Sequence, residues 1–149
     1  MKLVEREVER EVKRRINEFH FVAQYLYTRF CQANTFTGRL AESIVIDMQD
    51  ISKDIQKFRK IGGMTVDYLL SNYGEASDTK KESFESVIHI CDTYLAKMKQ
   101  ILITAKKQVK DANDQMVIQK GDLTYEEGLE FIEALKAMKE RAEAELETL

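Results

Sequence analysis

The sequence of 149 residues contains no proline, no tryptophan, only six glycines and only two cysteines. Proline and glycine form the turns of a many-stranded sheet, so their scarcity argues against a fold built from short strands. With 44% apolar and 33% charged residues, the composition favours long amphipathic helices instead. The sequence therefore predicts an all-α fold.

Long apolar runs, paired cysteines and a large net charge are also missing. No stretch of about 18 apolar residues occurs, and the start MKLVEREVER is charged where a signal peptide is apolar, so we expect a cytoplasmic protein without a membrane span. Cys31 and Cys91 lie far apart within helical patterns, which favours buried free thiols over a disulfide or a metal pair. The net charge of −3 gives no general attraction to nucleic acid or anionic lipid.

Four stretches repeat apolar residues every three or four positions, which places them on one face of a helix. They run from Lys2 to about Ala33, from Arg39 to Gly63, from Thr79 into KKQVKDANDQ, and from Thr124 onward. The predicted buried stripes are Val12, Ile16, Phe19, Ala23, Leu26 and Phe30, then Leu40, Ile44, Met48, Ile51, Ile55 and Phe58, then Phe84, Ile88, Cys91, Leu95, Met98 and Leu102, and finally Leu129, Ile132, Leu135 and Met138. Without an internal repeat or linker, these stretches predict a single four-helix-bundle domain over residues 1–149.

Glycines set the expected helix ends. Gly62 and Gly63 favour a helix C-terminus, and Gly121 supplies a break before the capping box that begins at Thr124. The apolar segment TVDYLLSN after Gly63 then predicts a short helix, in a connection long enough to cross the bundle. Two antiparallel hairpins joined by such a crossover make a ferritin-like topology.

The segment Ile61–Gly63, the short TVDYLLSN helix and the Gly-Asp-x-Thr segment Gly121–Thr124 resemble the Dps branch of the ferritin superfamily, over nearly the whole chain. The resemblance implies a homo-oligomeric cage, a dodecamer, that oxidises and stores iron and protects the cell under stress. Many members of that family also bind DNA, so the resemblance implies DNA as a further partner.

The chain departs from the family at its ferroxidase site. The positions that correspond to the family's glutamate, aspartate and two histidines fall on Gln56, on Ser52, near Thr37, and near Tyr25 or Leu26. The only histidines are His20 and His89, and neither follows a glutamate by three residues, as the ferritin di-iron motif requires. The resemblance therefore implies iron sequestration with the usual ferroxidase site absent or rebuilt, and it leaves a ferroxidase activity open.

Two groups of carboxylates are the candidate ligands for iron. Asp47, Asp50 and Asp54 share one flank of the second helix with Glu42, where they either face a cage cavity and bind hard cations or form an ordinary solvated face. The second group is Asp122, Glu126 and Glu127. These residues best match the family's three-fold pore, although acidic residues near a helix start are also expected from the helix dipole.

A basic stripe near the start is the candidate DNA-binding surface, and it consists of Lys2, Arg6, Arg10, Lys13 and Arg14. Glutamates interleave with it, and Glu–Arg pairs one turn apart explain the pattern without DNA.

A second hypothesis, from a different functional class, is a non-enzymatic helical interaction module. In that hypothesis Tyr68, Leu69 and Leu70 of the short helix are exposed and bind a partner. The same amphipathic helices serve both hypotheses.

Overall fold

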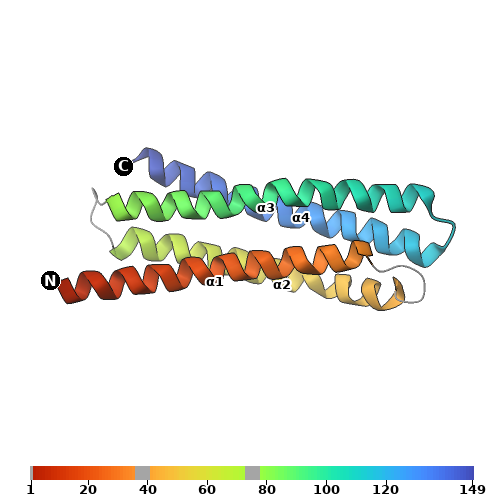
Figure 1. The fold of residues 1–149 in the computed structure, drawn as a ribbon, viewed down its shortest axis with the longest axis horizontal. Coiled ribbons are helices and arrows are strands. Elements are labelled where there is room, and N and C mark those ends of the chain that lie inside the picture. Colours follow the sequence, from red (N-terminus) through yellow and green to blue (C-terminus); the bar gives the residue numbers. More distant parts are fainter. Residues whose placement is uncertain (1, 36–40, 73–77) are drawn as a thin grey trace.

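A computed structural model describes residues 2–35, 41–72 and 78–149, with the side chains of residues 2–5, 41–44, 46, 47 and 78 left aside. Four helices fill these ranges: α1 (Lys2–Thr35), α2 (Ala41–Asn72), α3 (Asp78–Asp111) and α4 (Gln115–Glu147). They lie side by side as an elongated bundle, and the described ranges contain no strand (Figure 1). The predicted all-α class and the four-helix bundle are confirmed.

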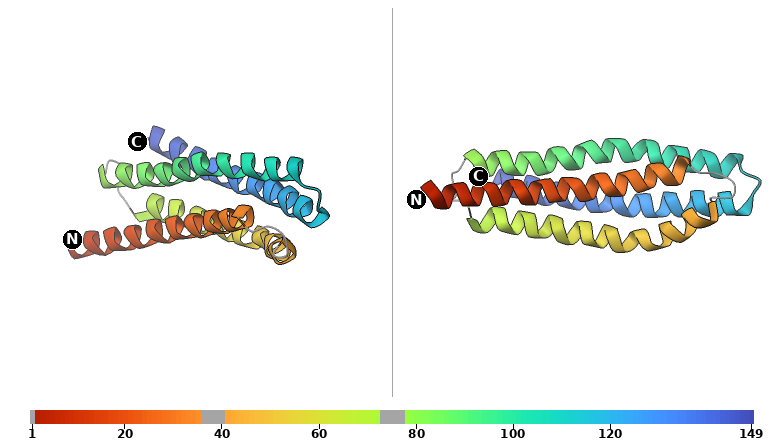
Figure 2. Two further views of the ribbon diagram at one scale, coloured as in Figure 1. Left: turned by 45° about the vertical axis from the view of Figure 1, so that its right-hand side comes forward. Right: turned by 60° about the horizontal axis from the view of Figure 1, so that its bottom comes forward.

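The helices form two antiparallel pairs, α1 with α2 and α3 with α4, and both chain ends lie at the same end of the bundle (Figure 1). α1 packs beside α2 and α3, and α4 also packs beside α2 and α3, so α2 and α3 meet only across the diagonal. The two turned views in Figure 2 show the same arrangement. Because only residues 73–77 separate α2 from α3, the chain runs up, down, up and down without the long crossover that was predicted.

The predicted apolar stripes make most of the core. Phe19 stacks on Phe58 at 4.9 Å between ring centroids, Phe58 meets Phe131 edge-on at 5.4 Å, and Phe131 stacks on Phe30 at 5.9 Å. All four rings are fully buried, and they join α1, α2 and α4 at the centre of the bundle. Aromatic pairs at these distances add to the free energy gained by burying apolar surface.

The expected helix end at Gly62 and Gly63 is wrong, because α2 continues through both glycines to Asn72. Gly62 is buried, and a Cβ there would lie 2.9 Å from Met138 Cε and 3.0 Å from Phe19 Cε1. This glycine lets neighbouring helices approach, and the packing offsets its poor helix propensity of about 1 kcal/mol. The predicted short helix is therefore the last two turns of α2.

The expected start of the last helix is also wrong. α4 begins at Gln115, where the Asp114 side chain caps the helix by accepting a hydrogen bond of 2.7 Å from the Met116 backbone. Gly121 lies inside α4, where a Cβ would overlap Val109 and approach the Ala105 carbonyl oxygen to 3.2 Å. Gly121 therefore permits the close contact between α3 and α4.

No helix in the described part of the chain is long and apolar enough to cross a membrane.

Candidate docking groove between α3 and α4

The structure describes the side chains of two of the four carboxylates predicted as a flank of α2, Asp50 and Asp54. Asp54 pairs with Arg29 of α1, and Asp50 is exposed with Lys53 at 3.8 Å as its nearest cation. The side chains of Glu42 and Asp47 lie outside the described residues. Across the part of the chain whose side chains are described, no three His, Cys, Asp or Glu residues gather closely enough to hold a metal ion.

The second predicted acidic group divides between solvent and a partly buried position. Asp122 and Glu126 are exposed on α4, whereas Glu127 is half-buried with one carboxylate oxygen that has no hydrogen-bond partner among the described residues. Burial raises the pKa of the Glu127 carboxyl, and the neighbouring Glu130 and Glu126 raise it further. This position therefore disfavours the charged form of the Glu127 carboxyl, and it would suit an uncharged side chain such as glutamine.

Replacing Glu127 by glutamine is expected to stabilise the protein near neutral pH. A pKa that is higher in the folded state contributes stability below the usual glutamate range, and this contribution is lost as the pH rises through the folded pKa. Glu127→Gln removes the buried charge and should gain at most about 1 kcal/mol at about pH 7, with no gain at about pH 4. Thermal unfolding at both pH values measures the difference, with exposed Glu126→Gln as the control. An equal gain at both pH values would show that the carboxyl charge is not the cause.

In the described part of the predicted basic stripe of α1, Arg14 is paired with glutamates. Arg14 binds Glu11 at 2.6 Å and Glu18 at 3.4 Å, and the Arg14 guanidinium lowers the pKa of the Glu11 carboxyl to about 2. Arg6, Arg10 and Lys13 are exposed, and the side chain of Lys2 lies outside the described residues. The expected Glu–Arg pairs are present, and DNA binding stays a prediction.

The partner surface predicted at Tyr68, Leu69 and Leu70 is wrong. Leu69 is fully buried in the core, Leu70 is half-buried, and the Tyr68 ring lies under the Arg15 guanidinium at 4.5 Å. These residues hold α2 in the bundle. An interaction surface must therefore be sought elsewhere.

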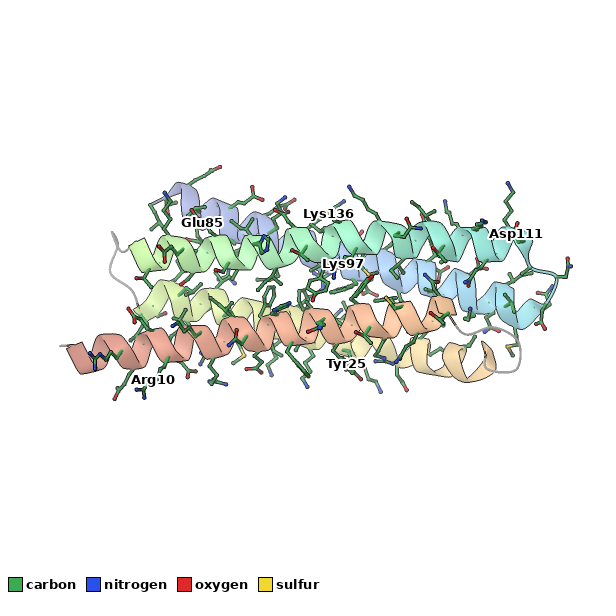
Figure 3. The ribbon with its side chains drawn as sticks, viewed as in Figure 1. Arg10, Tyr25, Glu85, Lys97, Asp111 and Lys136 are labelled. Carbon is green, nitrogen blue, oxygen red and sulfur yellow. The ribbon has the colours of Figure 1, made fainter. Side chains whose placement is uncertain are left out.

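A groove of about 440 Å³ lies between α3 and α4, on the side away from the core. Leu95 and Leu102 are half-buried and Leu129 is 40% exposed, so the bundle leaves these apolar groups partly exposed. Its lining residues are Asp92, Leu95, Ala96, Lys99 and Leu102 from α3, with Leu129, Ile132, Lys136 and Lys139 from α4. In Figure 3 Lys136 lies along the upper edge, where α3 and α4 run side by side.

Lysines border this groove although the whole chain carries a net charge of −3. Three lysines and one aspartate are among its lining residues. The aspartate, Asp92, lies 2.6 Å from Lys139, and this contact raises the pKa of the Lys139 ammonium. Within the described ranges no carboxylate pairs with Lys99 or Lys136, so the groove keeps uncompensated positive charge.

One turn beyond the lining residues, a lysine again lies beside an apolar side chain. The ammonium of Lys106 on α3 lies 4.8 Å from the ring centroid of Tyr125 on α4. Lys106 follows Lys99 by seven residues, so both lie on the same side of α3, about 10 Å apart along its axis. The apolar surface with its lysine border therefore extends over several helical turns.

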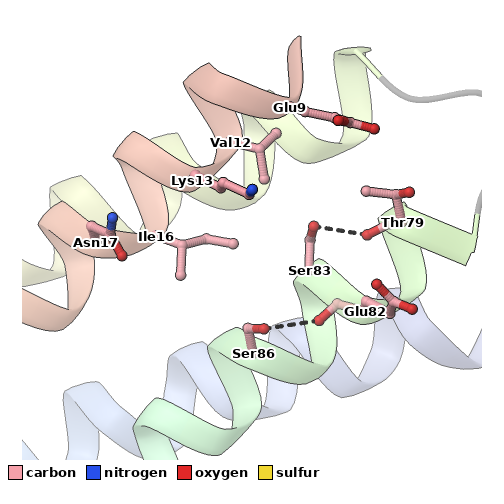
Figure 4. A pocket seen from close by; sticks show the side chains of 9 residues that line it. All are labelled: Glu9, Val12, Lys13, Ile16, Asn17, Thr79, Glu82, Ser83 and Ser86. Atoms are coloured by element: carbon pink, nitrogen blue, oxygen red, sulfur yellow. Dashed lines mark hydrogen bonds between the residues drawn. The ribbon is translucent and has the colours of Figure 1, made fainter. Parts of the chain in front are cut away.

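A second cleft, of about 480 Å³, separates α1 from α3 (Figure 4). Most of its lining residues are polar. The small side chains of Ser83 and Ser86 leave the cleft open where larger side chains would close the interface. Both hydroxyls donate to carbonyl oxygens of their own helix, Thr79 and Glu82 respectively. The cleft offers neither uncovered large apolar surface nor a charge of one sign.

Further along α1 and α3 the interface is closed by aromatic residues. His20 Nε2 lies 3.1 Å from the Tyr94 hydroxyl. The ammonium of Lys97, which is labelled in Figure 3, lies over the Tyr27 and Tyr94 rings at 5.2 and 5.5 Å. His20 is exposed, and its imidazole is within hydrogen-bonding distance of the Tyr94 hydroxyl. Cys91 is buried, which raises the pKa of its thiol to about 12, and Cys31 is half-buried, both as free thiols.

The groove was not predicted, yet the sequence carries a signal for it. Ile88, Leu95 and Leu102 recur every seven residues within the predicted stripe of α3, beside the buried series Phe84, Cys91 and Met98. The two series are offset by four residues, so they run side by side along one face of α3. The second series is half-buried and includes two residues of the groove.

Comparisons with protein families, with curated proteins and with solved structures find no match to this chain.

Proposed function

We propose that this protein is a non-enzymatic interaction module that binds a helix of a partner protein in the groove between α3 and α4. The observation that carries the proposal is the apolar floor of the groove, formed by Leu95, Leu102 and Ile132. The chain's own helices bury Ile132 but leave Leu95 and Leu102 only half-buried, and Leu129 at the edge is 40% exposed. Apolar grooves between helices accept amphipathic helices through the same packing that joins helices within a bundle.

The shape of the groove favours a helix over a compact ligand. Its α3 wall extends from Asp92 to Leu102 and its α4 wall from Leu129 to Lys139, which at 1.5 Å per residue is about 15 Å on each side. A partner helix of about three turns covers that length. Its apolar residues, repeating every three or four positions, then meet the floor.

A second copy of this chain does not fit the groove through the same face. A two-fold arrangement would bring the same surface of both copies together, so the lysine-bordered groove of one copy would face the lysine-bordered groove of the other. Like charges brought together at an interface cost free energy. The proposed occupant is therefore a different helix.

Selection from a displayed library of amphipathic helices tests the proposal. We expect the wild-type protein to enrich helical binders, and Leu129→Glu to weaken them by about tenfold or more, because it puts a carboxylate at the apolar edge. Ile103→Glu is the matched control, since Ile103 is 60% exposed but does not line the groove. Equal enrichment by the wild type and Leu129→Glu would exclude the groove as the binding site.

An iron-storing cage is the second candidate, and the half-buried Glu127 carboxyl between Glu126 and Glu130 is the observation that favours it. We rank it second because α2 and α3 lack a long crossover and Asp54 is engaged by Arg29.

Light scattering on a sizing column distinguishes the two candidates. The interaction module is expected near 17.3 kDa, and a dodecameric cage near twelve times that mass. A cage that also oxidises and retains Fe(II) faster than buffer would replace the proposal made here.

A further inference from the structure

We infer that the partner helix carries carboxylates on both sides of its apolar stripe, so that the groove selects an acidic amphipathic helix. This inference rests on the proposed docking function and adds the chemistry of the partner. Its basis is the distribution of lysines around the groove.

Three cations along the groove have no carboxylate partner among the described residues. Lys99 and Lys106 lie on the α3 side and Lys136 on the α4 side, whereas Lys139 already binds Asp92. The groove therefore presents positive charge on both of its borders. The two lysines of α3 are seven residues apart, which matches carboxylates seven residues apart on one flank of a docked helix.

Charge complementarity of this kind contributes to recognition in two ways. It speeds the encounter of partners at low salt, and it disfavours partners that bring lysine or arginine to the same positions. The net charge of −3 gives an acidic partner no general attraction to the chain, so the lysines along the groove favour its approach through this face. The groove therefore provides orientation as well as affinity.

A helix also accounts for the spread of the charges better than an anionic lipid does. The lysines at positions 99 and 106 are about 10 Å apart along α3, and Lys136 lies on the opposite border. A single acyl chain with one anionic head can neutralise one end of this array. A helix distributes several carboxylates along both sides of its apolar stripe.

The test uses displayed helices of about three heptads with a constant apolar stripe and with flank positions drawn from Glu, Gln and Lys. On the wild-type protein we expect Glu-flanked helices to be enriched about tenfold over Gln-flanked ones at low salt, and less at high salt. The double variant Lys99→Glu, Lys136→Glu should invert the preference toward Lys-flanked helices. Replacing the same two residues by glutamine should weaken the preference for Glu-flanked helices without inverting it, because Lys106 remains.

The matched control is Lys57→Glu, Lys60→Glu, because both residues are exposed on α2, away from the groove. It makes the same change in net charge and should keep the wild-type preference. Circular dichroism confirms that each variant is folded.

The possible results separate the two levels of the argument. Helices that bind in the groove without any preference among Glu, Gln and Lys flanks would overturn the acidic-partner inference and leave the docking function standing. Failure of the wild type to enrich helices above Leu129→Glu would overturn the docking function itself. A charge preference that Lys57→Glu, Lys60→Glu inverts equally well would assign it to net charge instead of the groove.

Discussion

Gly121→Ala is expected to destabilise the protein by about 2 kcal/mol, whereas Gly63→Ala is expected to stabilise it by about 0.5–1 kcal/mol. Both glycines lie inside helices, so alanine improves helix propensity at both positions. They differ in surroundings. A Cβ at Gly121 overlaps Val109 and approaches the backbone oxygen of Ala105 to 3.2 Å, while at Gly63 its nearest neighbour is Arg141 Nη1 at 3.8 Å.

Urea unfolding followed by far-UV circular dichroism gives both free energies of unfolding. The Gly63 substitution also distinguishes the continuous α2 from the helix end expected from the sequence. A C-terminal glycine with positive φ would make alanine costly there. A destabilised Gly63→Ala protein would therefore contradict the continuous helix.

Helical periodicity was read correctly from the sequence because two effects agree along each stretch. Residues such as Phe19, Ile55 and Met98 recur at helical spacing, and neighbouring residues rarely oppose a helix, since proline is absent. Burial and local preference then favour the same structure. This is why four helices could be predicted.

The glycines were read incorrectly because their local meaning depends on a distant contact. Gly62 and Gly121 are suited to a helix end, but they are equally suited to a place where another helix comes close. Met138 and Phe19 decide the first case, and Val109 decides the second. No residue adjacent in sequence reveals these neighbours.

This error changed the predicted topology as well. Once α2 ends at Asn72 instead of Gly63, the connection to α3 shrinks to residues 73–77 and the crossover disappears. The ferritin-like topology depended on that connection. The resemblance to the Dps branch shared the same landmarks.

Candidate sites were harder to predict than helices, since charge density along a sequence does not show which charges meet. Asp54 was assigned to a carboxylate flank, but Arg29 of another helix engages it. Lys99 and Lys136 are ordinary exposed lysines in sequence, and only the pairing of α3 with α4 places them beside one groove. A binding surface formed by two helices requires their relative rotation, which periodicity alone leaves undetermined.

Phe58→Ala is expected to cost about 3–5 kcal/mol, a large part of the stability of a domain of this size. Phe58 is fully buried between Phe19 and Phe131, so its removal leaves a cavity where α1, α2 and α4 meet. The neighbouring rings come from three helices and cannot all move inward without disturbing other contacts. The lost transfer free energy and the cavity therefore add.

Phe21→Ala is the matched control, because the Phe21 ring is 68% exposed on α1 and its removal should change stability by less than about 0.5 kcal/mol. The shift in the midpoint of urea unfolding measures the loss of stability of each variant, provided that the dependence of the unfolding free energy on urea concentration is unchanged. A loss below about 1 kcal/mol for Phe58→Ala would mean that the site collapses around the cavity, as happens in loosely packed interiors. Such a result would contradict the tight packing of the phenylalanine cluster among α1, α2 and α4.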